Sequence, residues 1–464
     1  MTRRTDQLKL GAFLANSGHH VAAWRHPKAQ ADASLDFDYF RQVAQTAERG
    51  RFDALFVADV VALWGHHLDA LSRTARGEHF EPLTLMAALA AVTSRIGLIA
   101  TATTSYNEPY HIARKFASLD YLSKGRAAWN LVTSVVSDEA WNFGREAHID
   151  HAERYRRAEE FHDVVKGLWD SWEDDAFLRD KASGQYFDPA KLHVLDHKGE
   201  YFSVRGPLNV ARPPQGHPVL VQAGASDAGK ALAARVAEVI FAMAETIPAA
   251  QAFYTDVKQR AAALGRDPDG IKILPGITPF IGRTREEARE LFEEFQSLVD
   301  PVLGLRLLAD TLGEDIDLSA HDLDGPLPDT PVGQRGSRRD KVLELARNEG
   351  LTIRQLYLRL AGGNPVIGTA EDIADTFDAW FQARACDGFN VFFPYLPGGI
   401  EVFVDEVVPL LQERGLLRRE YEGATLRENL GLARPANRFA GSAACGSRRC
   451  CWPPAAPWRR RRSR

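Results

Sequence analysis

The clearest candidate for binding chemistry is a short turn within residues 219–229, VLVQAGASDAG. An apolar run leads into Gly224, Ala225 and Ser226, and a helical pattern begins directly after them. Glycine lets the backbone approach a phosphate closely, and a serine N-cap leaves helix N–H groups where the helix dipole favours an anion. An ordinary strand-to-helix turn with a serine cap has the same spacing, so the pattern alone favours neither reading.

A second pair of candidate ligands lies at the start of a helix predicted over residues 150–172. His151 and Tyr155 are four residues apart and therefore share one helix face. An imidazole and a phenol beside a helix N-terminus could hold another edge of the same phosphate. The structural alternative is a partly exposed histidine next to a core tyrosine. The neighbouring Arg154 and Arg157 are predicted to be solvated.

The element that must position such ligands is a strand–helix–strand unit over residues 96–134. Residues 96–103 are apolar and β-prone, a helical period follows, and residues 127–133 are extended again. In a βαβ unit the two strands are expected to be parallel neighbours. This unit therefore predicts a parallel sheet.

Polar residues come late in these strands. Thr101, Thr103 and Asn130 lie there, and Asp59 ends an earlier buried strand over residues 53–60. Parallel sheets bind ligands at the C-terminal ends of their strands. Each residue alone favours a structural role, since threonine suits strands and asparagine can be a satisfied core amide. The set together indicates a ligand rim.

Strand and helix patterns alternate along most of the chain. The expected strands are 8–14, 53–60, 96–103, 127–133, 218–222, 239–244, 271–281 and 389–395. With about eight helices between them, they predict an α/β fold, a (β/α)8 TIM barrel forming one domain over residues 1–437. Insertions are expected at about 174–215 and 300–365, the second being of the kind that forms a lid or substrate wall.

Composition excludes some classes of protein. The chain has a formal net charge of −5, although residues 436–464 contain eight arginines and no acid. The rest of the chain is therefore strongly acidic and is expected to be a poor general binder of nucleic acid. Residues 438–464 are predicted to form a disordered, Arg-rich tail. No apolar run approaches the roughly 18 residues of a membrane span, and the N-terminus lacks the apolar core of a signal peptide. We therefore expect a cytoplasmic protein that does not bind a membrane.

Common cofactor motifs are missing. The sequence has no GxGxxG, no GxxxxGK[ST] and no HExxH, which argues against a bound nicotinamide dinucleotide, a nucleoside triphosphate or a zinc-protease site. Cys386 is the one cysteine before the tail, so no disulfide framework is expected. Several histidines occur, but none has metal-ligand spacing, and no metal is predicted.

Residues 108–134, EPYHIARKFASLDYLSKGRAAWNLVTS, resemble the bacterial luciferase-like flavin monooxygenases. The resemblance is strongest to the branch of nitrilotriacetate, EDTA and dibenzothiophene-sulfone monooxygenases, and it runs from about Leu8 to Asn437. It implies FMN bound across the C-terminal mouth of the barrel. The positions that match the family's flavin ligands are Asp59 in FVAD, Thr101 in GLIATATT, His151 and Tyr155 in HAERY, and Ser226 in QAGAS, with Asn130 under the ring. Thr103 is the alternative to Thr101.

The resemblance also implies a reaction. A separate NAD(P)H:flavin reductase would supply reduced FMN (FMNH2), consistent with the missing dinucleotide motif. Dioxygen would add at the flavin C4a position, and the hydroperoxide would oxidise a small organic substrate, with possible C–N or C–S cleavage. His19 and His20, which follow the first strand, are catalytic candidates from placement alone. A homodimer or homotetramer is the family expectation.

Two rival functions and the substrate stay open. The rivals are a deazaflavin-dependent oxidoreductase that transfers hydride without oxygen, and a non-catalytic flavin-binding barrel. The loops near the expected rim carry both cations and aromatics, a mixture that selects neither a polycarboxylate nor an aromatic substrate. The cations are Arg25, Lys28, Arg73, Arg76 and Arg145, and the aromatic candidates for a cover are Trp24, Trp64, Trp141 and Phe143.

Overall fold

Eight parallel strands close into a barrel within the part of the chain that the computed structural model describes, residues 3–64, 67–313, 316–328 and 337–440. They are β1 (Lys9–Leu14), β2 (Ala54–Val57), β3 (Gly97–Thr103), β4 (Ala127–Val132), β7 (Val219–Gln222), β8 (Val239–Ala242), β9 (Lys272–Ile281) and β11 (Gly388–Phe392). Each pairs in parallel with the next, and β11 closes the circle on β1, with Leu10 opposite Phe389. The predicted (β/α)8 barrel is confirmed.

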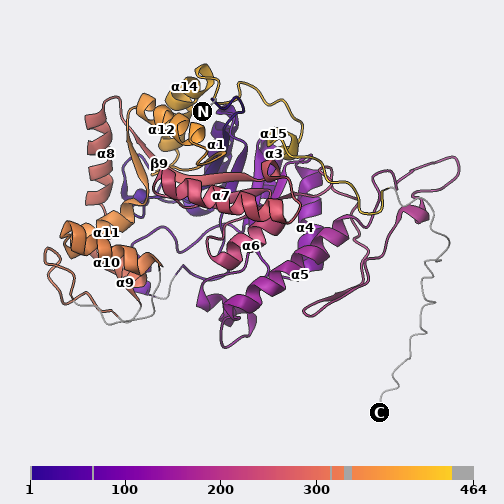
Figure 1. The fold of residues 1–464 in the computed structure, drawn as a ribbon, viewed down its shortest axis with the longest axis horizontal. Helices are drawn as coiled ribbons and strands as arrows, with labels where there is room; N and C mark the ends of the chain where they lie inside the picture. Colours follow the sequence, from indigo (N-terminus) through magenta and orange to yellow (C-terminus); the bar gives the residue numbers. More distant parts are fainter. Residues whose placement is uncertain (1–2, 65–66, 314–315, 329–336, 441–464) are drawn as a thin grey trace, which may run out of the picture.

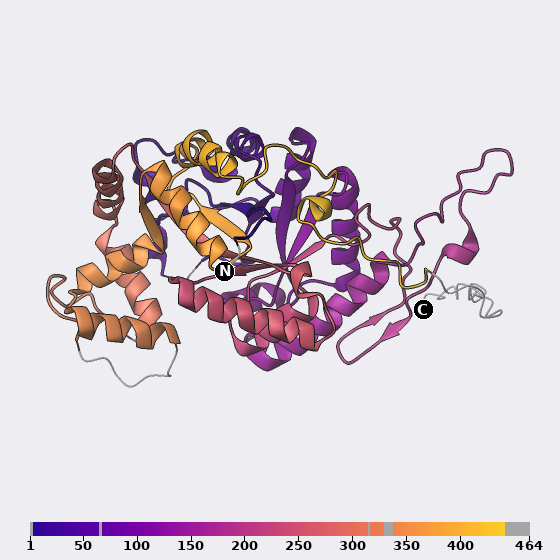
Figure 2. The ribbon, with the colours of Figure 1, turned by 45° about the horizontal axis from the view of Figure 1, so that its top comes forward.

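Helices cover the outside of the barrel (Figures 1 and 2). They are α1 (Phe37–Arg49), α3 (Pro82–Val92), α4 (Pro109–Leu122), α5 (His151–Trp169), α6 (Asp227–Val236), α7 (Ile247–Ala263), α8 (Arg285–Ser297), α12 (Ala370–Gln382), α13 (Gly398–Val402) and α14 (Val408–Glu413). Most begin at a side-chain cap: Asp36 accepts from two N–H groups of α1, and Thr284 accepts from one of α8. Between α13 and α14 the chain makes a π-helical turn, Phe403–Val407.

Side chains along each strand point alternately into two cores, one under the helices and one inside the barrel. Their outward side chains pack under the helices, as Trp129 does against Phe116 and Phe161, with ring centroids 5.8 and 5.9 Å away. Their inward side chains fill the barrel. Leu426 and Leu430, from α15 (Leu426–Asn429) and the residue after it, join this interior cluster. Because α15 contributes to the bottom of the barrel, the open end is the C-terminal one.

Two segments depart from the barrel. Between α5 and β7 the chain forms a small hairpin, β5 (His197–Lys198) with β6 (Ser203–Val204), which extends away from the barrel (Figure 2). Between α8 and α12 lie α9 (Pro301–Leu312), α10 (Ser337–Glu349), α11 (Ile353–Gly362) and β10 (Pro365–Gly368). Neither α11 nor β10 was predicted; β10 pairs with the end of β9 outside the barrel.

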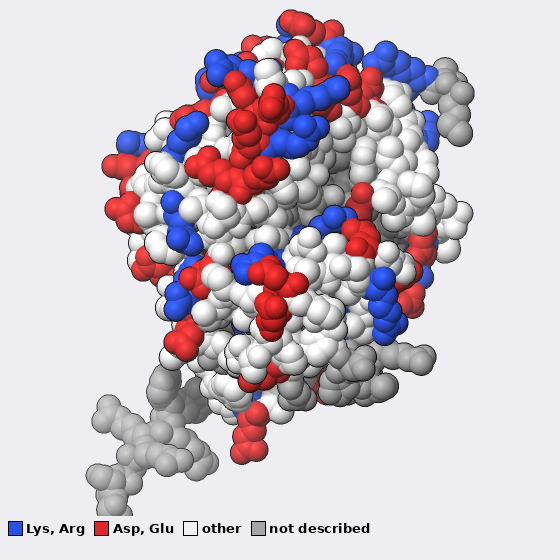
Figure 3. Space-filling view, turned by 90° about the vertical axis from the view of Figure 1, so that its left-hand side faces the viewer, with Lys and Arg blue, Asp and Glu red and all other residues white. Residues whose placement is uncertain are grey.

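The helical lobe of α9, α10 and α11 has its own apolar core. That core includes Val21, Ala22 and Ala70, which belong to the loops after β1 and β2. The lobe therefore supports the loops around one side of the barrel mouth. The face that carries it mixes acidic and basic side chains (Figure 3).

No helix in the described ranges is long and apolar enough to cross a membrane. Of the tail predicted over 438–464, residues 441–464 lie outside the described residues.

Candidate active site

An aromatic floor closes the barrel interior just below its C-terminal mouth. Phe13, Phe56, Phe241 and Phe392 come from four different strands and point inward. Ring centroids lie 4.6 Å apart for Phe13 and Phe56, and 4.9 Å apart for Phe13 and Phe392. Apolar rings packed edge to face exclude water, so a ligand above them would rest on a dry surface.

Thr101 and Asn130 meet on the inner face of β3 and β4. The Thr101 hydroxyl donates to the Val57 carbonyl at 2.7 Å and accepts from Asn130 Nδ2 at 2.9 Å. This fixes the asparagine amide and leaves its Oδ1 buried without a hydrogen-bond partner among the described residues. A buried acceptor without a partner costs free energy, so it is a place where a ligand donor would bind.

The alternative threonine is already engaged. Thr103 Oγ1 lies 2.8 Å from the Ser134 hydroxyl and accepts from the Ser105 N–H at 3.1 Å. Both threonines are buried and face inward, but Thr101 is the one that contacts Asn130. The geometry therefore favours Thr101 as part of a site.

Asp59 follows β2 and is paired with a histidine that sequence reasoning did not single out. His79 Nε2 donates to Asp59 Oδ1 at 3.2 Å. The hydrogen bond to this carboxylate raises the pKa of His79, which burial opposes. The two residues are twenty positions apart, and His79 lies in an irregular segment, so no local pattern indicated the pair.

The two candidate catalytic histidines differ. Both nitrogens of His20 are used, because Nδ1 accepts from the Ala22 N–H at 3.3 Å and Nε2 lies 3.0 Å from Gln296 Oε1. His19 stacks on Phe392 at 4.3 Å, and its buried Nε2 has no partner in the described part of the chain. Burial lowers the pKa of His20 to about 4 and that of His19 to about 3. His19 is thus a neutral imidazole with a free acceptor, and His20 is a structural residue.

The glycine–serine turn has the predicted capping geometry. Ser226 Oγ accepts from the Gly229 N–H at 3.1 Å, and Ser226 itself is exposed. At Gly224 a Cβ would lie 2.4 Å from Gln222 Nε2 and 2.8 Å from the Gly229 Cα, so only glycine fits. Ala225 is exposed between them. The N-terminus of α6 is thus open to an anion.

His151 and Tyr155 lie on α5, which packs against α6. Their ring centroids are 5.0 Å apart; His151 is exposed and Tyr155 is half-buried. Arg154, between them, is not solvated as predicted. It is buried and donates to the Ser134 carbonyl and to His148 Nε2, because this face of α5 turns toward the end of β4.

Arg157 is also not simply solvated. Its guanidinium lies 4.3 Å from the centroid of the Phe202 ring, and burial lowers its pKa. One turn along α5 from Arg154, it packs on the segment that leads into β7, a contact that no local pattern indicates.

The strand order arranges these residues in an arc. Asp59 follows β2, Thr101 and Asn130 lie in β3 and β4, and Ser226 follows β7, the next strand in the barrel. Adjacent strands are about 4.8 Å apart. The arc can therefore hold an elongated ligand with an anionic end near Ser226 and a polar, flat end near Asn130. No cluster of histidine, cysteine and acidic residues suited to a metal was found in the described ranges.

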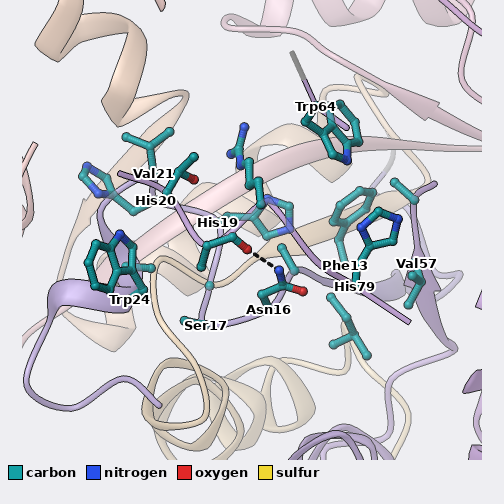
Figure 4. A pocket seen from close by; sticks show the side chains of 18 of the residues that line it. Phe13, Asn16, Ser17, His19, His20, Val21, Trp24, Val57, Trp64 and His79 are labelled. Carbon is teal, nitrogen blue, oxygen red and sulfur yellow. Dashed lines mark hydrogen bonds between the residues drawn. The ribbon is translucent and has the colours of Figure 1, made fainter. Parts of the chain in front are cut away.

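A cavity of about 190 Å³ opens beside the arc, between the loops that follow β1 and β2 (Figure 4). Two of the predicted cover residues, Trp24 and Trp64, line it, as do His19 and His79. The other two are elsewhere: Trp141 is exposed, and Phe143 stacks on Tyr106 at 4.8 Å. Because the cavity lies between the loops after β1 and β2, it is at the end of the arc that is farther from Ser226.

Known proteins resemble the chain over nearly its whole length. Residues 17–386 match the family model described as luciferase-like monooxygenase. N-acetyl-S-(2-succino)cysteine monooxygenase of Bacillus subtilis (strain 168) is 55% identical over 447 residues, covering 95% of this chain and 100% of the relative. Nitrilotriacetate monooxygenase component A of Aminobacter aminovorans is 50% identical over 446 residues, covering 94% and 98%.

A solved structure agrees with this similarity. Riboflavin lyase, solved with modified FMN and its substrate riboflavin, superposes with a TM-score of 0.81 at 33% identity, covering 94% of this chain and 98% of that chain. These matches confirm the resemblance and the barrel inferred from residues 108–134 and the strand pattern. The chain belongs to the luciferase-like monooxygenase family.

Proposed function

We propose that this chain is the oxygenase component of a two-component system that uses reduced FMN and dioxygen to oxidise a small organic substrate. The observation that carries the proposal is the arc from Asp59 through Asn130 to Ser226, which joins an unpartnered buried acceptor to an open, serine-capped helix N-terminus. The relative named component A supports a separate partner. The structure solved with modified FMN supports the cofactor.

The residues fit FMN at both ends. At the phosphate end, Ser226 would donate its hydroxyl and Gly224 and Ala225 would allow close backbone approach, with His151 and Tyr155 from α5 on the other edge. When bound, reduced flavin supplies the activation of dioxygen.

At the ring end, Asn130 Oδ1 would accept from a ring N–H, with Thr101 holding the amide in place. Asp59, held by His79, would bind a second donor of the ligand.

The protein's own contribution is orientation and exclusion of water. The phenylalanine floor would give the ring an apolar surface, and Asn130 and Thr101 would supply polar contacts beside it. A dry, fixed environment strengthens each polar contact and limits unproductive release of hydrogen peroxide. His19 Nε2, an unpartnered acceptor beside the cavity, could orient a substrate donor.

The partners follow from the same proposal. A separate NAD(P)H:flavin reductase would supply the reduced flavin, and assembly into a homodimer or homotetramer stays a prediction, as does a cytoplasmic location. The relatives are named monooxygenases, which favours oxygen insertion over the deazaflavin-dependent hydride transfer that the sequence left open. Their names differ in substrate, so the substrate class has to come from this chain's residues.

Isotope labelling tests the proposal. The purified chain is incubated with NADH, FMN, a flavin reductase, ¹⁸O₂ and a panel of small organic acids, amines and sulfides, and products are analysed by mass spectrometry. We expect a product that carries one ¹⁸O atom and is lost when FMN or oxygen is omitted. A product formed equally well without oxygen would contradict the proposal and support hydride transfer.

A further inference from the structure

The cavity beside the flavin arc combines apolar walls with one unpaired cation. Trp24, Trp64 and Phe80 are among its aromatic residues, and Arg76 lines it from the loop after β2. Figure 4 shows Trp64 and Trp24 from two sides of this space, with His19 between them. A cation in a mainly apolar cavity that also holds a few polar groups is a recognition element for an anionic group.

Of the cations that the sequence placed near the rim, Arg76 is the one that lines this cavity, and it differs from Arg73 and Arg25 in its contacts. Arg73 is paired with Asp300 at 2.9 Å, and Arg25 donates to the Leu298 carbonyl. Within the described ranges Arg76 makes no hydrogen bond and no ion pair. Arg76 is exposed to solvent, and the protein atoms around its side chain lower its pKa by partial loss of hydration. Arginine stays charged at neutral pH, so the cavity contains an uncompensated positive charge.

The segment that carries Arg76 is fixed by hydrogen bonds on both sides. Trp24 Nε1 donates to the Arg73 carbonyl at 3.1 Å. Asn16 Nδ2 donates to the Ala75 carbonyl and, at 3.0 Å, to the Glu78 carbonyl. Because these donors come from the loop after β1, the two loops are joined around the cavity, and Arg76 is held between the joined points.

The other titratable groups that face the cavity do not neutralise Arg76. No acidic residue is among the described residues that line the cavity, and Asp59, which follows the lining residue Ala58, is hydrogen-bonded to His79. His19 and His20 are neutral, since burial lowers their pKa values and the charge of Arg76 lowers them further. Among the described lining residues, the guanidinium therefore sets the sign of the local field.

We propose that this cavity is the substrate subsite and that Arg76 binds a carboxylate of the substrate, so that the substrates are small organic acids with an apolar portion held by the tryptophans. Its role as a substrate subsite rests on the proposed function. The flavin phosphate is a poor alternative occupant, because Ser226 follows β7, and β3 and β4 lie between that strand and β2. The two anion sites are thus at opposite ends of the arc.

The test measures binding to the purified full chain without flavin, so its readout is independent of oxygenase activity. Phenylacetate and succinate are titrated in parallel with phenylacetamide and succinamide, by calorimetry and by fluorescence of the cavity tryptophans. We expect one of the acids to bind at least about tenfold more tightly than its amide, because the amide lacks a charge-assisted hydrogen bond to arginine. FMN affinity is measured in the same samples.

Three variants separate charge from structure. Arg76→Gln should remove the preference for acid over amide, and Arg76→Lys should keep part of it. Arg73→Gln is the matched control in the same segment, and it should keep the full preference because Arg73 is engaged with Asp300. All three should bind FMN as the unchanged chain does.

Four results would overturn the proposal: no saturable binding of either acid, equal binding of acid and amide, an acid preference that survives in Arg76→Gln, or a loss of FMN affinity in that variant. The last would place Arg76 on the flavin phosphate. A chain that prefers the acids but binds no FMN supports the anion site and overturns the oxygenase proposal, so the two failures are distinguishable.

Discussion

Replacing Ser226 by alanine should separate binding of the flavin phosphate from binding of the ring. Two contributions are lost together. The hydroxyl caps α6 through the Gly229 N–H at 3.1 Å, and loss of such a cap costs about 1 kcal/mol of stability. The same hydroxyl would donate to the phosphate, and a hydrogen bond to a charged group contributes about 1.5–3 kcal/mol. FMN affinity should therefore fall by roughly tenfold to a hundredfold.

The assay is an anaerobic titration of the chain with reduced FMN and, separately, with reduced riboflavin, which has no phosphate. In Ser226→Ala the affinity for FMN should fall while the affinity for riboflavin is unchanged. Thr284→Ala is the matched control, because Thr284 caps α8 through the Glu287 N–H at the same 3.1 Å. It should lose similar stability and keep full FMN affinity. Equal losses for FMN and riboflavin in Ser226→Ala would refute the phosphate assignment.

Three further outcomes follow from the site. Asn130→Leu should change the free energy of unfolding by only about 1 kcal/mol, because loss of the Nδ2 hydrogen bond to Thr101 is offset by removal of the unpartnered Oδ1, while flavin affinity falls at least about tenfold in the same titration. Asp59→Asn should lower the pKa of His79, which can be measured by NMR. Because the pKa of His79 is raised in the folded chain, the contribution of the Asp59–His79 pair to stability is full below the pKa of the unfolded state. That contribution is lost as the pH rises through the pKa of the folded state. Burial lowers the pKa of His20 to about 4. The free energy of unfolding should therefore decrease by about 3 kcal/mol as the pH falls from about 6.5 to 4, because the unfolded state binds the proton first. Urea unfolding of His20→Gln should show a flatter dependence over that range, and an unchanged dependence would contradict the assignment.

Much of the barrel was predictable because parallel strands buried on both faces are continuous apolar runs. The strand predicted over residues 96–103 is present as Gly97–Thr103. Helix α1 is amphipathic over Phe37–Arg49 and ends at Gly50. By contrast, β10 (Pro365–Gly368) is short and half-buried, and it is a strand only because β9 is long enough to pair with it outside the barrel.

The candidate residues Asp59, Asn130 and Ser226 could be selected from the sequence because they lie late in or just after predicted strands, or at a predicted helix start. What could not be predicted depends on contacts between distant segments. His79 reaches Asp59 from an irregular loop, and the phenylalanine floor is assembled from four strands. The unpaired state of Arg76 is visible only once Arg73 is seen to be paired with Asp300, because in the sequence these arginines look alike.

The most direct test of the account is anaerobic titration of the purified chain with FMN, oxidised and then photoreduced, followed by exposure to air. We predict saturable binding of reduced FMN, tighter than that of oxidised FMN, and reoxidation by oxygen that is altered by the protein. Failure to bind FMN in either redox state would contradict the central claim and leave only the barrel fold standing.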